Sequence, residues 1–309
     1  MTLQQLQYII ALDQHRHFVK AAKSCFVAQP TLTLQVKKLE EEINAQLFDR
    51  SKHPVEPTPL GEQFIAQARE ILAGFDELKA MVSQERETVE GRYTVGIIPT
   101  LSPYLVPLFI SEFSKRYPNT HLSIKEIQSN EIITGLKDHS LDIGILVTPI
   151  EEAGLRSINL FYEPFLIFAS KNSRLSQKEL ITSKDITHEG LWLLTEGHCF
   201  RNQVLNICGK NLKQAQRGFS FESGTIETLK NMVRNKMGYT LIPELSVQSK
   251  IDQPFIRHFA EPKPVREVSI VVKNSFARER LIDILRKQIL EVIPSHYKKN
   301  DRFRRIQWR

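Results

Sequence analysis

Apolar residues recur at helical spacing through the first forty positions of the chain. Leu3, Leu6 and Ile9 predict a first helix over residues 3–12, and a second short helix is predicted over residues 18–24. Residues 25–27 then form a turn. A third helix is expected to begin near Gln29, because Pro30 suits the first helical turn, where its missing N–H is not needed.

The third predicted helix has an inward face of Leu32, Val36 and Leu39 and a polar outward face. The outward residues are of types that read base edges and phosphates in a major groove. The predicted DNA-binding residues of this helix are Gln29, Pro30, Thr31, Thr33, Gln35 and Lys37. The alternative is an ordinary helical hairpin with a solvent-facing side, but such helices are usually rich in Glu and Lys. The pattern therefore favours a helix-turn-helix.

A longer apolar seam follows, with spacings of three and four residues. Its members are Leu60, Phe64, Ala68, Ile71, Phe75, Leu78 and Val82. This spacing is typical of a coiled coil, although a helix packed on its own domain would show it too. We interpret it as a dimerising linker helix, which would present two recognition helices to two half-sites of DNA.

From Tyr93 onward, short runs rich in β-branched residues alternate with helical patterns. Strands are predicted at 94–98, 122–124, 143–147, 165–168, 191–194, 239–242 and 268–272, and helices at 105–116, 132–139 and 226–235. This order predicts an α/β region with mainly parallel sheets. Residues 162–164 and 262–264 look like paired crossovers between two lobes, with a ligand site expected in the cleft between them.

Composition excludes several classes of protein. No apolar run among the 309 residues is long enough to span a membrane, and the N-terminus lacks a secretory pattern, so a cytoplasmic protein is expected. The net charge of +7 suggests an anionic partner, yet residues 1–60 hold seven basic and six acidic residues. Residues 297–309 hold six basic residues and one acidic residue, and we expect that end to be solvated and disordered.

Cys199 and Cys208 are the most informative chemical feature. Cys199 follows a predicted strand and Gly197 and begins a helical pattern, a position where the helix dipole stabilises a thiolate. In a continuous helix the two Cα atoms would lie roughly 13 Å apart, beyond the ~7 Å limit for a disulfide. Two buried cysteines acting as small hydrophobes are the alternative. A zinc site or a cysteine protease is disfavoured because no matching ligand or base spacing is visible, and no cofactor is expected.

The N-terminal motif AAKSCFVAQPTLTLQVKKLEEE, followed by LFDR and PTPLGE, resembles the winged helix-turn-helix of LysR-type regulators. The resemblance implies that Arg50 in the wing touches phosphate or the minor groove. It also implies a two-lobed effector domain similar to periplasmic binding proteins. Ala28 and Leu34 depart from the family pattern, and Ala28 removes a helix cap worth about 1 kcal/mol. The implied organisation is a DNA-binding domain over 1–60, a linker helix over 61–90, an effector domain over 91–300 (lobe I 91–162 and 265–300, lobe II 163–264) and a basic tail over 301–309.

Around Cys199, the segment GHCFRNQ, then four residues and Cys208, resembles the hydrogen-peroxide sensors of the LysR family. The resemblance implies that Cys199 is the peroxidatic thiol and Cys208 the resolving thiol. The residues implied to hold peroxide or tune the thiolate are Thr100, Ser129, His198, Arg201 and Arg266. Ser129 stands where the family has threonine, Asn130 replaces a histidine and Asn202 replaces an acidic residue.

We therefore expect a peroxide-responsive transcription activator that is not an enzyme. Its DNA-binding domains would be repositioned when Cys199 and Cys208 form a disulfide. It is expected to bind double-stranded DNA and to respond to hydrogen peroxide as its signal. Its expected protein partners are RNA polymerase and a thiol–disulfide reductase. Two chains are expected to form a homodimer that assembles to a homotetramer, and no contact with a membrane is expected. The alternatives are a LysR regulator responding to a metabolite in the interlobe cleft, a thiol-dependent peroxidase and a solute-binding protein.

Overall fold

The computed structural model describes the whole chain except residues 84–88, 188, 209–222, 248, 299–301 and 309. The first of two compact units is built from Met1–Glu87, and the second from Thr88–Lys137 and Leu141–Arg309. No helix in the described part of the chain is long and apolar enough to cross a membrane.

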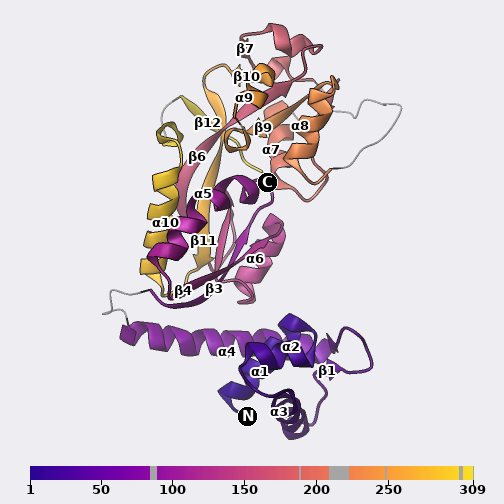
Figure 1. Cartoon of the computed structure of the whole chain (residues 1–309), viewed down its shortest axis with the longest axis vertical. Coiled ribbons are helices and arrows are strands. Elements are labelled where there is room, and N and C mark those ends of the chain that lie inside the picture. Colours follow the sequence, from indigo (N-terminus) through magenta and orange to yellow (C-terminus); the bar gives the residue numbers. More distant parts are fainter. Residues whose placement is uncertain (84–88, 188, 209–222, 248, 299–301, 309) are drawn as a thin grey trace. The chain divides into compact units, whose positions relative to one another are not determined.

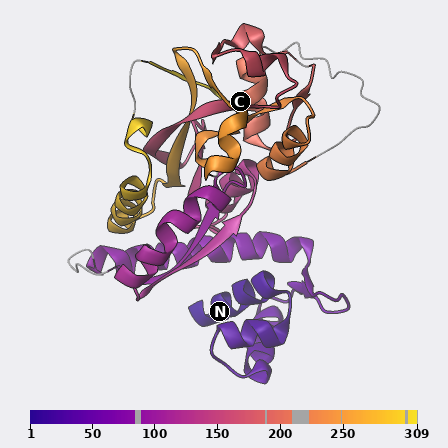
Figure 2. The same ribbon diagram turned by 45° about the horizontal axis from the view of Figure 1, so that its top comes forward.

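The first unit is a three-helix core with a two-stranded wing and a long helix (Figure 1, Figure 2). Its elements are α1 (Leu3–His15), α2 (Phe18–Ser24), α3 (Gln29–Glu42), β1 (Phe48–Asp49), β2 (Glu56–Pro57) and α4 (Pro59–Ser83). Thr2 and Gln5 form a capping box at the start of α1. Leu32, Val36 and Leu39 on α3 are fully buried, as their spacing predicts, and β1 pairs antiparallel with β2.

The predicted apolar seam lies on α4. Ala68 is buried and Phe64 packs against the core of the unit, whereas Leu60, Ile71 and Leu78 are exposed. The side chain of Val82 lies outside the described residues. Part of the seam therefore packs within its own unit, and three large apolar side chains along the helix remain uncovered in this chain.

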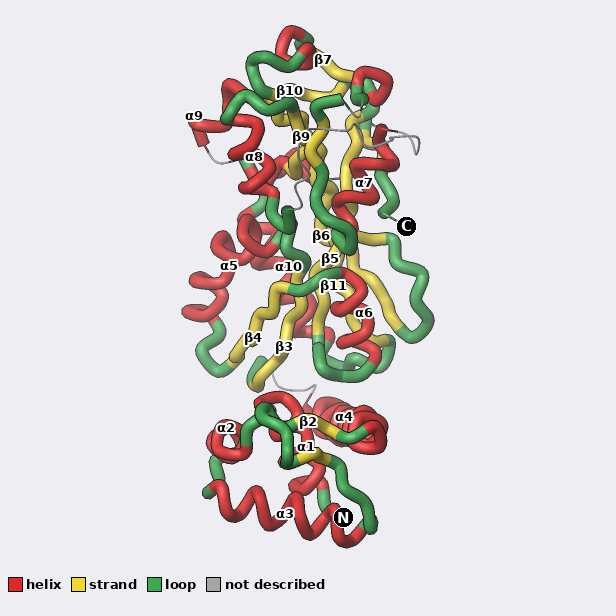
Figure 3. The backbone as a smooth tube through the Cα atoms, turned by 90° about the vertical axis from the view of Figure 1, so that its right-hand side faces the viewer, coloured by secondary structure: helices red, strands yellow, loops and turns green. Residues whose placement is uncertain are grey.

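The second unit is built on one mixed sheet, drawn as yellow strands in Figure 3. The strand order is β4-β3-β5-β11-β6-β10-β7, with β12 paired to β11 and β9 paired to both β6 and β8. The strands are β3 (Gly91–Ile97), β4 (Thr120–Glu126), β5 (Ile143–Thr148), β6 (Leu155–Ala169), β7 (Leu180–Ile181), β8 (Leu191–Trp192), β9 (Tyr239–Pro243), β10 (Ile256–Phe259), β11 (Lys263–Lys273) and β12 (Phe303–Arg305).

The expectation of mainly parallel sheets holds only in part, because the sheet is mixed. β3 pairs parallel with β4 and β5, but β11 pairs antiparallel with β5 and along most of its length with β6. The two long strands β6 and β11 run in opposite directions, and β5 and β9 pair antiparallel with them. The predicted crossovers lie on this pair, where Pro164 is in register with Val265.

Helices cover the sheet on both sides of the crossover. They are α5 (Ser102–Arg116), α6 (Ser129–Lys137), α7 (Cys199–Cys208), α8 (Ile226–Arg234), α9 (Ser249–Asp252) and α10 (Glu279–Val292), with short 3-10 turns η1 (Arg174–Gln177), η2 (Ser183–Asp185), η3 (Glu244–Ser246), η4 (Gln253–Phe255) and η5 (Ser295–Tyr297). α5 packs on α10, α6 on β5 and α8 on β9. One apolar core lies around β3, β5 and α10, and a second around β9, α7 and α8. The fold is thus α/β with two lobes, as predicted.

The C-terminal end differs from expectation. β12 runs parallel to the start of β11, and Ile306 and Trp308 are buried, at 6% and 5% exposure. Residues 302–308 are therefore an ordered part of the second unit rather than a solvated tail. The apolar residues Ile306 and Trp308 alternate with polar ones, a strand pattern that the count of basic charges concealed.

Candidate functional site

Cys199 is the first residue of α7, and the loop before it approaches lobe I closely. Gly197 has φ +92°, and a Cβ there would lie 2.4 Å from Oε1 of Gln128, the residue before α6. The positive φ favours glycine here, and a larger residue would also displace the end of the Gln128 side chain. Because Gln128 immediately precedes Ser129, the same approach brings Cys199 next to the start of α6.

The Cys199 side chain is almost completely buried, at 4% exposure. Burial raises the pKa of its thiol above the ordinary value, while the Ser129 hydroxyl, the Arg266 charge and the backbone N–H of Phe200 act in the opposite direction. The helix N-terminus thus assists the thiolate as predicted, but burial outweighs it. In this state the thiol form prevails at neutral pH.

Ser129 is buried at the N-terminal end of α6. Apart from its interaction with the Cys199 sulfur, its hydroxyl has no hydrogen-bond partner among the described residues. A buried hydroxyl normally finds a partner, so this one has capacity left for a small polar molecule beside the thiol. The structure thus brings Ser129 and Cys199 together.

Arg266 extends from β11 and is fully buried. It donates to Oγ1 of Thr100 at 2.9 Å and to the Thr100 carbonyl at 3.0 Å. Its Nε and Nη2 both lie 2.7 Å from Oε2 of Glu163, and its guanidinium carbon lies 5.6 Å from the centre of the Phe200 ring. Of the predicted site residues, Arg266 therefore contacts Thr100 directly, and it acts on Cys199 through its charge.

His198 and Arg201 flank the thiol on the chain. His198 is buried, and burial lowers the pKa of its imidazole, so the neutral form prevails at neutral pH. Arg201 donates from Nη1 to the Leu194 carbonyl at 2.9 Å, and its backbone N–H donates to the His198 carbonyl. The structure thus places Arg201 as a brace for the loop that precedes Cys199.

Cys208 is the last residue of α7 and is half-buried, and burial raises the pKa of its thiol to about 12. Both thiols are free. The ten residues Cys199–Cys208 form one continuous helix, which separates the two Cα atoms by roughly 13 Å at 1.5 Å per residue. The structure therefore represents the dithiol form.

Sequence reasoning missed Glu163, which is completely buried on β6. The available signal was a lone carboxylate within the largely apolar stretch 160–169 of β6, where an unpaired charge is costly. It also missed Tyr104, whose hydroxyl lies 3.0 Å from Oε1 of Glu227 across the two lobes. The two departures noted in the sequence, Asn130 and Asn202, are both exposed.

In the first unit, the predicted DNA-binding residues lie on α3 and the wing. Gln29, Pro30, Thr31 and Lys37 are exposed, and Thr33 and Gln35 are half-buried. Nε2 of Gln29 lies 3.4 Å from the Thr33 hydroxyl, and Nε2 of Gln5 lies 3.3 Å from Oε1 of Gln35. α3 begins at Gln29 after Ala28, which makes no side-chain cap.

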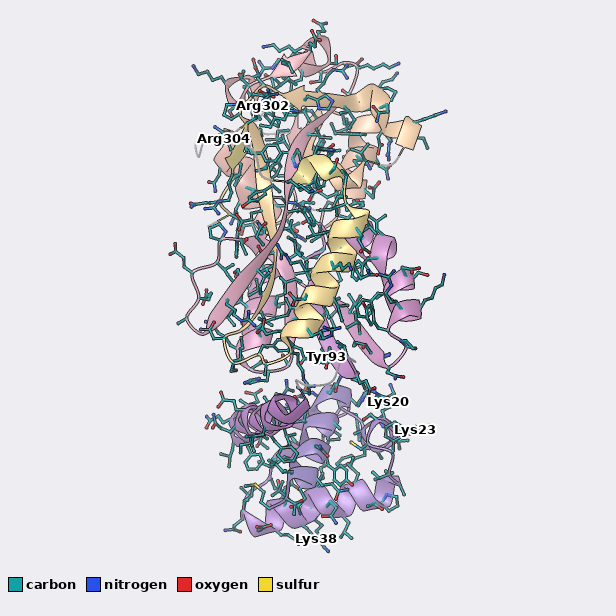
Figure 4. All side chains as sticks on the ribbon, turned by 90° about the vertical axis from the view of Figure 1, so that its left-hand side faces the viewer. Lys20, Lys23, Lys38, Tyr93, Arg302 and Arg304 are labelled. Atoms are coloured by element: carbon teal, nitrogen blue, oxygen red, sulfur yellow. The ribbon has the colours of Figure 1, made fainter. Side chains whose placement is uncertain are left out.

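Arg50 is held within its own unit. Its guanidinium lies 2.5 Å from Oε2 of the buried Glu40 and over the Phe18 ring. Glu40 also accepts the backbone N–H of Leu47 at 2.8 Å, so it fixes the wing to α3. Three exposed lysines were not predicted as site residues and project from the same unit in Figure 4: Lys20 and Lys23 on α2 and Lys38 on α3.

Cys25, in the turn between α2 and α3, is half-buried, and burial raises the pKa of its thiol. It packs against the core of the first unit, which fits the role of a small packing residue. Within the described residues, no cluster of His, Cys, Asp and Glu could hold a metal ion.

Comparison with known proteins identifies both units. Residues 3–62 match the model of the bacterial regulatory helix-turn-helix protein, lysR family, and residues 86–293 match the LysR substrate binding domain. The chain belongs to the LysR family. The DNA-binding transcriptional dual regulator OxyR of Escherichia coli K12 is 33% identical over 301 residues, which cover 97% of this chain and 98% of that protein.

Other relatives extend the comparison. The hydrogen peroxide-inducible genes activator of Pectobacterium carotovorum is 33% identical over 94% of this chain and 97% of its own length. The structure of full-length OxyR from Pseudomonas aeruginosa is similar with a TM-score of 0.81 and 34% identity, covering 95% of this chain and 99% of that one. The two-lobed fold and the helix-turn-helix head are therefore shared along nearly the whole length.

Proposed function

We propose that this LysR-family protein is a transcription activator that responds to hydrogen peroxide through Cys199 and Cys208. The observation that carries the proposal is the buried Cys199 thiol at the start of α7, which faces the Ser129 hydroxyl and the charge of Arg266. Similar proteins named for hydrogen peroxide induction support it.

The chemistry requires two balanced steps. The Cys199 thiolate attacks one oxygen of hydrogen peroxide, the O–O bond breaks, and with one proton the products are Cys199 sulfenic acid and water. The Cys208 thiol then displaces the sulfenic hydroxyl, giving a Cys199–Cys208 disulfide and a second water. Two thiols thus lose two electrons to peroxide, and a cellular dithiol returns them when a reductase resets the switch.

The residues around the thiol have separate roles in this proposal. The hydroxyls of Ser129 and Thr100 orient the peroxide oxygens, and neutral His198 offers a further hydrogen bond. Arg266 favours the thiolate and the developing negative charge on the leaving oxygen. Arg201 acts indirectly, because its guanidinium braces the Leu194 carbonyl before the site.

The disulfide is also the conformational trigger. The Cα atoms of Cys199 and Cys208 must approach within about 7 Å, so α7 has to unwind. α7 contributes Phe200, Val204 and Ile207 to the second apolar core. Unwinding therefore repacks the lobe that carries them, and through it the arrangement of the assembled effector domains.

The output is double-stranded DNA binding by the first unit. α3 enters the major groove with Gln29, Pro30, Thr31, Thr33, Gln35 and Lys37, and Lys20 and Lys23 on α2 meet phosphates. Arg50 stays 39% exposed while paired with Glu40, and its exposed part contacts the backbone or minor groove from the wing. The exposed Leu60, Ile71 and Leu78 of α4 pair two chains into a dimer, and dimers assemble into a tetramer. The protein acts in the cytoplasm on RNA polymerase at the promoter and is not an enzyme.

Footprinting of reduced and peroxide-treated protein on its own promoter region tests the proposal. We expect the wild-type footprint to change length or position on oxidation. The Cys199→Ser variant should keep the reduced footprint in peroxide, and the matched control Cys25→Ser should respond as wild type does. A peroxide response that survives in Cys199→Ser would refute the sensor role. Multiple turnovers of peroxide under a reductant, without a footprint change, would indicate a thiol peroxidase instead.

A further inference from the structure

Within the part of the chain that the structure describes, the buried carboxylate of Glu163 is the one charged group that pairs directly with the Arg266 guanidinium. Both residues have essentially no exposed side-chain surface, and their contact distance is 2.7 Å. Oε1 of Glu163 accepts the backbone N–H of Leu245 at 2.8 Å. In every one of these contacts Glu163 acts as an acceptor, which is the role of the ionised carboxylate.

Arg266 has two sets of anchors. Glu163 holds Nε and Nη2 on one side, and Thr100 receives Nη1 and Nη2 on the other. The guanidinium therefore cannot turn toward the Cys199 sulfur without losing one of these sets. Since a fully buried positive charge acts over several ångströms, the opposite charge of Glu163 also reduces the field that Arg266 exerts on Cys199.

We propose that Glu163 is a positioning residue that holds Arg266 against Thr100 and offsets its charge, and so sets how readily Cys199 ionises. The biological meaning of this inference rests on the proposed function. Its test does not, because it measures the ionisation of Cys199 without peroxide. It gives the site a resting state in which the thiol is restrained, since one buried carboxylate opposes the one buried guanidinium beside it.

Other titratable groups face the same site, and their charge states also affect the ionisation of Cys199. On β8–α7, His198 is neutral because burial lowers its pKa. On α5, burial raises the pKa of Tyr104, which contacts Glu227 of α8. On η5, burial raises the pKa of Tyr297, and Glu244 of η3 adds negative charge near Glu163 and pairs with His296. Tyr104, Tyr297 and His198 stay uncharged around neutral pH, so the Glu163–Arg266 balance dominates.

Direct titration of the thiolate by its ultraviolet absorbance tests this proposal without using peroxide. The full chain carries Cys25→Ser and Cys208→Ser so that Cys199 is the sole thiol, and a further Cys199→Ser variant supplies the blank. Within this two-serine background, we expect the titration midpoint of Cys199 to be highest with Glu163 present, lower in Glu163→Asp and lowest in Glu163→Gln. At a pH below the midpoint, Glu163→Gln should hold about tenfold more thiolate, equivalent to roughly one pKa unit.

Circular dichroism checks that each variant is folded. If Glu163→Gln does not fold, Glu163→Asp carries the test, because its shorter side chain weakens the contact with Arg266. Adding Arg266→Gln should shrink the difference between Glu and Gln at position 163. A midpoint that is unchanged or higher in a folded Glu163 variant would overturn the proposal, whatever the outcome of the peroxide experiments.

A second inference follows independently from the C-terminal end. Oxygen atoms of its backbone accept hydrogen bonds from α7: Nε2 of Gln203 lies 2.8 Å from the Ile306 carbonyl, and Nδ2 of Asn206 lies 2.8 Å from the Gln307 carbonyl. The Ile306 side chain belongs to the same apolar core as Val204 and Ile207 of α7. The tail is fixed to the sheet by pairing of β12 with β11 and by Arg305, whose Nη1 lies 2.7 Å from Glu267.

These contacts can exist only while Gln203 and Asn206 stand on an intact helix. Joining Cys199 to Cys208 unwinds that helix, so it removes the partners of Ile306 and Gln307. We infer that residues 302–308 form a strap that stabilises the dithiol form and is released by the disulfide. Coupling of this kind is reciprocal, so loosening the strap must favour the disulfide.

The test compares Ile306→Ala with the matched control Arg304→Ala, whose exposed side chain contacts Ser183 of η2 instead of α7. Figure 4 marks Arg304 on this segment. Each full chain is equilibrated in one dithiol–disulfide buffer and its cysteine state is read by mass spectrometry. We expect about a tenfold higher ratio of disulfide to dithiol in Ile306→Ala and no change in Arg304→Ala.

Limited trypsin digestion of the wild type provides a second measurement that needs no variant. The bond after Arg305 should be cut faster in the oxidised protein than in the reduced protein. Equal ratios in the two variants, together with equal cleavage rates, would overturn the strap. Failure of any chain to form the disulfide would instead overturn the proposed function and the strap together.

Discussion

Replacing Arg266 by Met would leave Glu163 as a buried carboxylate without its counter-charge. Arg266 and Glu163 are 1% and 0% exposed, so solvent cannot compensate the loss. Removing one partner of a buried ion pair typically costs about 3–5 kcal/mol of unfolding free energy at neutral pH. The same substitution removes a positive charge from the Cys199 site, so the pKa of the thiol should rise further and its oxidation should slow.

The stability loss should depend on pH with a definite sign. Burial already raises the pKa of Glu163 with Arg266 present, and without Arg266 it rises further above the unfolded value of about 4.3. A raised folded-state pKa stabilises the fold at pH values below the unfolded pKa, and that contribution disappears as pH rises through the folded pKa. The loss of unfolding free energy in Arg266→Met, relative to wild type, should therefore be smallest near the unfolded pKa of Glu163 and largest at neutral and higher pH.

Urea unfolding at a series of pH values measures this deficit. Both tryptophans of the chain, Trp192 and Trp308, lie in the second unit, so their fluorescence reports its unfolding separately from the head. Adding Glu163→Gln to Arg266→Met should recover stability at neutral pH, since no buried charge then stands alone. A deficit that is constant with pH, or a double variant no more stable than Arg266→Met, would refute this account of the pair.

Three further outcomes follow from other parts of the molecule. Ala28→Ser should raise the melting temperature of the first unit, because it supplies the missing cap of α3, worth about 1 kcal/mol; a folded variant with an unchanged melting temperature would contradict this. Ile71→Asp on the exposed side of α4 should lower the sedimentation mass of the assembly without unfolding the head, and unchanged mass would argue against the linker-helix dimer. Asp252→Asn should destabilise the second unit in urea by about 1–3 kcal/mol, less than loss of a sole partner, because Lys230 loses Asp252 at 2.8 Å but keeps Glu227 at 2.9 Å; an unchanged free energy of unfolding would show that the pair is dispensable.

Local patterns predicted the elements well. The start of α3 at Gln29 follows from the proline that suits a first turn, and the predicted strands at 143–147, 239–242 and 268–272 all lie within observed strands. The direction of β6 and β11 did not follow from their composition. A buried strand has the same apolar composition in either orientation, so the antiparallel pairing of β6 with β11 is seen only in the register of the structure.

The site residues that lie close together in the sequence were predicted, whereas the pairing of Glu163 with Arg266, which the fold brings together, was not. The cysteines and Gly197 stand within one short segment, so spacing and motif resemblance located them. Glu163 and Arg266 are about a hundred positions apart, and only the register of β6 with β11 brings them together. The raised pKa of Cys199 was not predicted either, because the helix N-terminus is visible in sequence whereas the extent of burial is not.

The central claim is that peroxide converts the Cys199 and Cys208 thiols into one disulfide despite their separation along α7. Peptide mapping by mass spectrometry, on full-length reduced protein treated with one equivalent of hydrogen peroxide, tests it most directly. We expect a Cys199–Cys208 linked peptide and an unmodified Cys25 thiol. Two free thiols at positions 199 and 208, or a disulfide that includes Cys25, would contradict it.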